Sequence, residues 1–108
     1  EDDSLGSIVY DDGNDLAQST ASQKLHENSL TNNDSSLSGS MYLFNPASTT
    51  FVKHFASNIN SMANPSISDH ILVSGYCNVT AAIDGVQFTF SSGNIDAGTI
   101  KLYGIKDS

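Results

Sequence analysis

The chain has 108 residues, a length typical of a single domain. It carries 12 acidic and 4 basic residues, and the resulting net charge of −8 argues against nucleic acid and anionic membrane surfaces as partners, because clustered Lys and Arg bind both. No apolar run approaches the roughly 20 residues that a membrane-spanning helix needs, so no membrane insertion is expected.

An acidic segment at residues 1–15 opens the chain, and residues 16–108 follow it as the predicted domain. Residues 7–10 are a short apolar stretch that we expect to form a strand before a turn at 12–14. Residues 16–25 fit either a helical stripe or an extended strand, and the weak helix formers among them favour the strand.

Two polar loops and a hairpin are predicted next. Residues 26–40 hold too few apolar side chains to pack, so we expect an exposed loop there. The apolar residues that follow alternate with period two, which predicts two strands joined by a turn at 45–49. Residues 58–69 are the second predicted polar loop, interrupted by Asn64 and Pro65.

The remaining chain is predicted to be mostly strand. Residues 70–80 alternate, and Gly75 in their middle indicates a bulge or bend. Residues 86–90 and 99–105 alternate in the same way, on either side of a turn at 93–96. Short strands at such regular spacing predict an all-β fold, an antiparallel β-sandwich. The residues that we expect to face its core are Phe51, Phe55, Phe88, Phe90, Ile100 and Leu102, with Cys77 as a small buried filler and Lys101 and Tyr103 facing outward.

Four stretches of the sequence carry a resemblance. They are residues 16–20 with 24–25, residues 43–55, residues 81–88 and the segment Ser92-Gly93-Asn94-Ile95-Asp96-Ala97-Gly98-Thr99-Ile100-Lys101-Leu102-Tyr103-Gly104-Ile105, which is the most specific of the four. Together they resemble a family of small virion proteins encoded by tailed phages. The resemblance implies a tail- or capsid-associated structural protein with a jelly-roll-like sandwich. Members of the family are longer at the amino end, which implies completion of the sandwich by strands from a missing amino-terminal segment or from another chain, because an open sheet edge invites pairing.

The sequence offers no catalytic constellation. His26, His54 and His70 do not fall at a metal-site spacing, and Cys77 is the single cysteine. The Gly-x-Ser-x-Gly motif of hydrolases does not occur. We therefore expect no enzyme activity, no catalytic residue, no cofactor and no structural metal.

Calcium bound by a loop is the one metal alternative. Its candidate ligands are Asp11, Asp12, Asn14 and Asp15, and separately Asn94 and Asp96, because carboxylate and amide oxygens suit a hard cation. Neither group matches the Asp-x-Asp-x-Asp-Gly pattern of a calcium loop, so turn capping by the same side chains is favoured.

The predicted function is assembly into a virion. We expect a structural protein that decorates a capsid or belongs to a tail or fibre, binds other virion proteins and forms a homo-oligomer, with a trimer as the expected state. Its contact surfaces are predicted at 27–38, 58–69 and 93–96. The alternative is a carbohydrate-binding module for host surface glycans, because tyrosine rings suit both protein interfaces and sugar rings. The predicted interface residues are Tyr42, Tyr76, Tyr103, Asn94 and Asp96.

Overall fold

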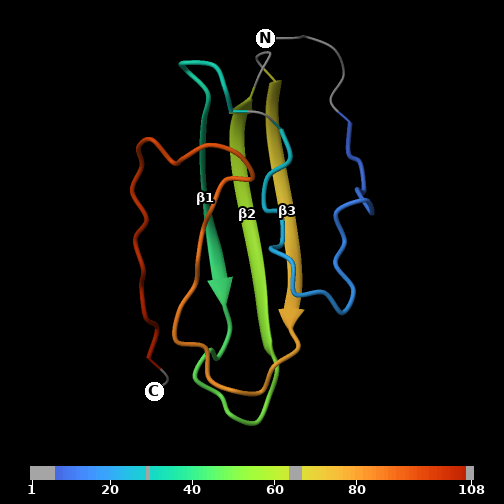
Figure 1. Cartoon of the computed structure of the whole chain (residues 1–108), viewed down its shortest axis with the longest axis vertical. Coiled ribbons are helices and arrows are strands. Elements are labelled where there is room, and N and C mark those ends of the chain that lie inside the picture. Colours follow the sequence, from blue (N-terminus) through green and yellow to red (C-terminus); the bar gives the residue numbers. More distant parts are fainter. Residues whose placement is uncertain (1–6, 29, 64–66, 107–108) are drawn as a thin grey trace.

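A computed structural model describes residues 7–28, 30–63 and 67–106, and its regular structure is one antiparallel sheet (Figure 1). Its strands are β1 (Ser36–Leu43), β2 (Lys53–Ala63) and β3 (Ile67–Cys77), in the order β1-β2-β3. The protein is therefore all-β, as the alternation predicts. None of the described residues is helical, so that part of the chain contains no helix able to cross a membrane.

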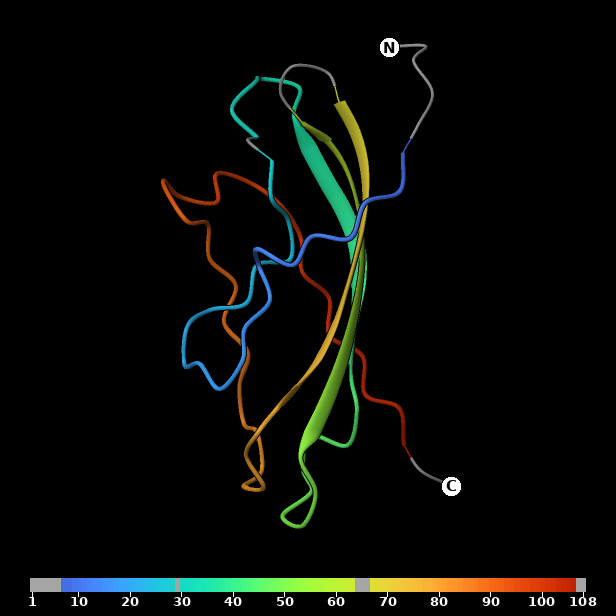
Figure 2. The ribbon, with the colours of Figure 1, turned by 90° about the vertical axis from the view of Figure 1, so that its right-hand side faces the viewer.

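The sheet has one covered face and one open face. In an antiparallel pair, residues directly opposite each other point to the same side, so the register assigns every residue to a face. Figure 2 shows most of the irregular chain gathered on one side of the sheet. The residues on that covered face are mainly apolar: Leu37, Met41, Leu43, Phe55, Ile59, Ile71 and Val73. On the open face, Ser, Asn, His and Tyr predominate.

The first predicted polar loop is wrong at residues 36–40, and the second is wrong throughout its described residues, 58–63 and 67–69, because polar and apolar residues alternate there. Residues 26–35 are irregular as expected, but β1 already begins at Ser36. In the range 58–69, Asn58 and Asn60 lie on the open face of β2 and Ile59 on the covered face. In a sheet with one solvent-exposed face, only every second residue of a strand needs to be apolar. A stretch rich in serine and asparagine can therefore be a strand. The predicted break at Asn64 and Pro65 lies outside the described residues.

The predicted hairpin between residues 40 and 56 is confirmed. β1 and β2 pair antiparallel, and the backbone N–H of Ser48 donates to the Asn45 carbonyl at 3.1 Å in the connection. Asn45 adopts a φ of 48°, a left-handed conformation that asparagine tolerates better than most residues. β2 starts only at Lys53, so Phe51 lies in the connection and is exposed, contrary to its predicted place in the core.

Of the bulge or bend predicted at Gly75, the bulge is absent from β3. The pairing with β2 continues one to one through this position, where Gly75 lies opposite Phe55. A Cβ at Gly75 would lie 3.0 Å from Cε1 of Phe55. The glycine therefore leaves room for the aromatic ring on the neighbouring strand.

Four further predicted strands are wrong. Residues 7–10, 16–25, 86–90 and 99–105 are irregular. Each has strand-like composition, but a strand also needs a hydrogen-bonded neighbour, and the sheet ends at β1 and β3. Several residues predicted to be in the core are exposed as a result, namely Phe88, Phe90, Ile100 and Leu102, and Cys77 at the end of β3 is exposed as well.

A buried lysine fastens the chain after β3 to the start of β2. Lys53 is 0% exposed, and its ammonium donates hydrogen bonds to the carbonyls of Thr80 at 2.7 Å and Val79 at 3.3 Å. Nearby, the N–H of Ile83 donates to the Pro46 carbonyl at 2.8 Å. These bonds hold residues 79–83 against the lower end of the sheet in Figure 1.

The chain buries little surface for its size. Its accessible area is 9406 Å², whereas a folded monomer of 11.4 kDa is expected to expose about 5,800 Å². Its radius of gyration is 15.8 Å, against about 13 Å for a compact domain of this length. Among the described apolar residues, only Ala63 is buried. A single copy therefore has a thin core.

Candidate functional site

Two of the predicted interface residues, Tyr42 and Tyr76, lie on the open face of the sheet. Tyr42 belongs to β1 and is 57% exposed, and Tyr76 belongs to β3 and is 61% exposed. They occupy the two edge strands, with β2 between them. The structure thus brings to one face two side chains that are 34 positions apart in the sequence.

Phe44 and His54 complete an aromatic row with these tyrosines. The N–H of Phe44 donates to the His54 carbonyl at 2.9 Å, which extends the β1–β2 ladder by one residue. His54 lies opposite Tyr76, and their ring centroids are 5.9 Å apart. The rings of Tyr42 and Phe44 stack at 6.3 Å with an interplanar angle of 16°. We call Tyr42, Phe44, His54 and Tyr76 the aromatic row.

Polar side chains adjoin the aromatic row on the same face. Asn58 lies between Ser40 of β1 and Leu72 of β3 in the register. The Oδ1 atom of Asn58 accepts a hydrogen bond from Nε2 of His70 at 2.7 Å. Leu72 is largely exposed and adds apolar area beside the rings. Flat aromatic faces next to amide and hydroxyl groups can hold either the apolar side chains of a partner or the C–H face of a sugar ring.

The other three predicted interface residues belong to the irregular chain after β3. Tyr103, Asn94 and Asp96 are all exposed there. The sheet register does not join them to the aromatic row. Phe44 and His54, in contrast, were missed by the interpretation of the sequence. Phe44 is two residues from Tyr42 and so shares its face, whereas the position of His54 depends on the pairing of β2 with both edge strands.

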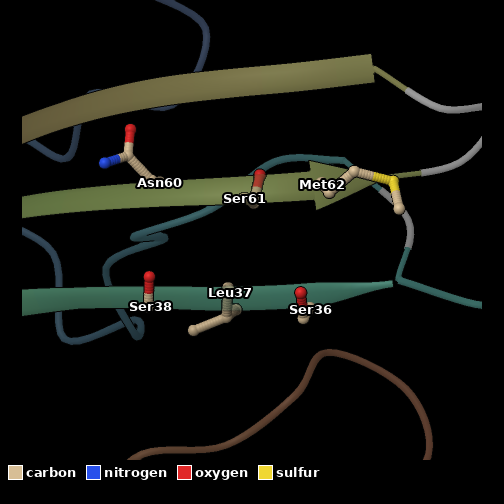
Figure 3. Close-up of a pocket in the computed structure, with 6 residues that line it drawn as sticks. All are labelled: Ser36, Leu37, Ser38, Asn60, Ser61 and Met62. Carbon is tan, nitrogen blue, oxygen red and sulfur yellow. The ribbon is translucent and has the colours of Figure 1, made fainter. Parts of the chain in front are cut away.

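A shallow depression lies between β1 and β2, near the end of the sheet where β1 begins (Figure 3). Short polar side chains dominate its lining, and no charged group contributes to it. The lining residues are Ser36, Leu37, Ser38, Asn60, Ser61 and Met62. Such a lining offers hydroxyl and amide hydrogen bonds but no group for acid–base chemistry.

A polar cluster on the covered face fastens residues 26–28 to the sheet. The Nε2 atom of His26 lies 2.7 Å from Oγ of Ser61, and the Asn28 amide donates to the Asp69 carboxylate. Ser61 and Asp69 face each other across β2 and β3. These are the residue types of a hydrolase triad, but Asp69 binds Asn28 and the Ser61 side chain is buried. These hydrogen bonds have a structural role, because they attach the chain before β1 to the sheet.

The first calcium candidate forms a capped turn. Asp11 accepts hydrogen bonds from the N–H of Gly13 at 2.9 Å and the amide of Asn14 at 2.6 Å. Asp15 accepts one from the Tyr10 hydroxyl at 2.6 Å, which raises the pKa of Tyr10 above its usual value. Asn94 and Asp96 are exposed in the second candidate. Within the described ranges, no group of three or more His, Cys, Asp or Glu side chains is placed to hold a metal ion.

Comparison with known proteins identifies no relative on which to base a function. No protein-family model matches the chain, and neither the curated proteins nor the solved structures give a match.

Proposed function

We propose that the chain is a structural subunit of a phage virion, a capsid-decorating or a tail- or fibre-associated protein that acts by packing against other subunits. The observation that carries the assembly role is the large accessible surface of one copy, 9406 Å². The excess over a compact monomer is on the order of 3,600 Å². Obligate interfaces bury about 2,000–5,000 Å² in total, half of it on each partner, so a copy with two neighbours, as in a trimer, can bury an excess of this size.

The exposed surface is also of the right chemical kind for assembly. Large apolar side chains near the end of the described chain are exposed, among them Ile100, Leu102 and Ile105. Exposed large apolar side chains are surface that contacts in an oligomer can bury. The virion assignment itself rests on the resemblance of residues 16–105 to small phage virion proteins. In this proposal, strands from another chain complete the jelly-roll-like sandwich.

Two measurements test the proposal. Native mass spectrometry of the purified full chain is expected to give a homo-oligomer, with the trimer as the first expectation. Electron cryo-microscopy of the particle is expected to place the chain on the capsid or in the tail. If the chain proves monomeric at high concentration and is absent from purified particles, the proposed function is wrong.

A carbohydrate-binding module is the second candidate, and the aromatic row favours it. Exposed rings that share the open face with Asn58 and His70 are suited to stack on and hydrogen-bond to a glycan. Replacing Tyr76 with Ala is expected to abolish saturable binding on an array of bacterial surface glycans. Tyr10→Ala, which removes an exposed ring outside the sheet and outside the aromatic row, is the matched control. Equal binding by both variants, or none by the wild type, would exclude the aromatic row as a glycan site.

A further inference from the structure

One edge of the sheet has none of the features that usually block pairing with another chain. Natural edge strands carry charges, prolines or bulges that oppose further strand addition. β1 (Ser36–Leu43, sequence SLSGSMYL) contains no charged residue and no proline, and its pairing with β2 is regular. β3, at the other edge, carries Asp69 and His70. The β1 edge is therefore the better acceptor for an added strand.

The backbone groups available at this edge follow from the ladder. Phe44 donates to His54 across β1 and β2, and such hydrogen-bonded positions alternate along an antiparallel pair. The N–H and C=O groups of the alternate residues therefore point away from β2. These residues are Leu37, Gly39, Met41 and Leu43. Leu37 also lies on the covered face yet is partly exposed, so an additional strand would improve its burial.

Residues 99–105 have the sequence pattern of a strand but no strand to pair with in the described part of the chain. They alternate like a strand, with Ile100 and Leu102 on one side and Lys101 and Tyr103 on the other, but no strand pairs with them. Leu102 is 97% exposed and Ile105 is 89% exposed. The segment is seven residues long, close to the eight residues of β1. The same chain thus contains a sheet edge that can accept a further strand, β1, and a strand-like segment that has no sheet to join, residues 99–105.

We propose that residues 99–105 of one copy add as a strand to the β1 edge of a second copy, an inference that rests on the assembly role proposed above. Ile100 and Leu102 then continue the covered face next to Leu37 and Met41 of the acceptor. Lys101 and Tyr103 emerge on the open face beside Tyr42, where Tyr103 prolongs the aromatic row. Reciprocal donation closes a dimer, and donation around a ring closes a trimer.

Charge favours a second copy as the occupant of the edge. The chain has a net charge of −8, so two copies repel each other over most of their surfaces. Residues 99–106 are the exception, because they contain two of the four lysines and no acidic residue. In its own chain this segment runs without pairing (Figure 1). The cationic, apolar segment of one copy therefore meets an uncharged edge of an acidic neighbour.

Substitutions on the donor and on the acceptor test the proposal. Leu102→Pro removes a backbone donor from the segment, and Ser38→Lys places a charge on the β1 edge. Each is expected to weaken self-association of the full chain about tenfold or more in analytical ultracentrifugation, since each opposes ladder formation over several residues. The matched controls are Val9→Pro, in the other exposed apolar segment, and Ser74→Lys, on the open face of β3. The controls are expected to associate like the wild type.

Hydrogen exchange distinguishes pairing of residues 99–105 with β1 of a second copy from pairing with β1 of their own chain. Amides of residues 99–105 and of Leu37, Gly39, Met41 and Leu43 are expected to become protected only at concentrations at which the chain associates. Protection at every concentration would mean that the segment folds back on its own edge, and the inference would be wrong. It would also be wrong if Ser74→Lys weakened association more than Ser38→Lys, or if Leu102→Pro had no effect. A chain that is monomeric alone but present in the particle would overturn this inference and leave the proposed function intact.

Discussion

Gly39 shows how closely β1 approaches β2. A Cβ at this position would collide with the carbonyl oxygen of Asn58 and lie 2.9 Å from Cα of Ile59. Both obstacles are backbone atoms of the central strand, which cannot rotate away as the end of a side chain can. The strand pair must separate to admit a methyl group.

We therefore predict that Gly39→Ala lowers the free energy of unfolding by about 1–3 kcal/mol, the usual cost of overpacking. Urea denaturation followed by far-ultraviolet circular dichroism measures the change. Ser40→Ala, at the next and exposed position of β1, is the control and should shift stability by no more than about 0.5 kcal/mol. Equal effects of the two substitutions would contradict the close approach of the strands.

Tyr10 gives a second prediction at the scale of single residues. Its pKa is raised above 10.0, first because its hydroxyl donates to Asp15 and second because the charges of Asp15 and Asp12 disfavour the phenolate. A raised pKa means that the contact with Asp15 favours the protonated phenol. The stabilisation of the folded state by this contact is therefore fully present below pH 10 and is lost as the pH rises through the pKa of Tyr10. Asp15→Asn is expected to lower this pKa more than Asp12→Asn does.

Carbon-13 chemical shifts of the tyrosine rings, followed against pH, measure the pKa of Tyr10 directly. Asp84→Asn, an exposed carboxylate elsewhere in the chain, should leave it unchanged. A pKa of Tyr10 that responds equally to Asp12 and Asp15 would show that the hydrogen bond is not the main cause.

At the scale of elements, local alternation predicted the β1–β2 hairpin but could not predict which other segments become strands. Residues 86–90 and 99–105 alternate as clearly as β1, yet only β1 has a neighbour to pair with. Conversely, the second half of β2 is predicted to be a loop because it is rich in polar residues, although a strand with one solvent-exposed face needs only every second residue to be apolar. Strand formation depends on pairing between distant residues, which a local pattern does not contain.

The candidate site, too, is only partly predictable from local sequence patterns. Tyr42 and Tyr76 could be selected as interface residues from their chemistry and their predicted strands. His54 joined them only through the register of β2, which places it opposite Tyr76. The aromatic row is thus a product of pairing among three strands, and a single strand indicates at most Tyr42 and Phe44 as neighbours on one face.

Lys53 supports a prediction about how the elements are held together. It is fully buried and binds the carbonyls of Val79 and Thr80. We predict that Lys53→Met lowers the free energy of unfolding by about 1–3 kcal/mol, because two carbonyls lose their partner while most of the side-chain volume is kept. Lys101→Met, which changes the same charge at an exposed position, is the control in urea denaturation. A variant as stable as its control would show that residues 79–80 are held by other contacts.

At the scale of the whole molecule, the thin core makes stability depend on concentration. If neighbouring copies bury the surface that one copy leaves exposed, association stabilises the folded state by mass action. The thermal midpoint of the wild type is then expected to rise by several degrees between micromolar and near-millimolar protein, measured by differential scanning calorimetry. Leu102→Pro is expected to flatten this dependence, and Val9→Pro to retain it. A midpoint independent of concentration would contradict assembly through the exposed surface.

The chain contains no tryptophan, so its intrinsic fluorescence comes from four tyrosines. All four rings, Tyr10, Tyr42, Tyr76 and Tyr103, are already in contact with solvent in the folded single copy. Denaturation therefore changes their surroundings little, whereas occlusion by a neighbour changes them strongly. Quenching by a small solute such as acrylamide reports on docking in this protein, and collisional access to the phenols becomes an optical measure of how many subunits have joined.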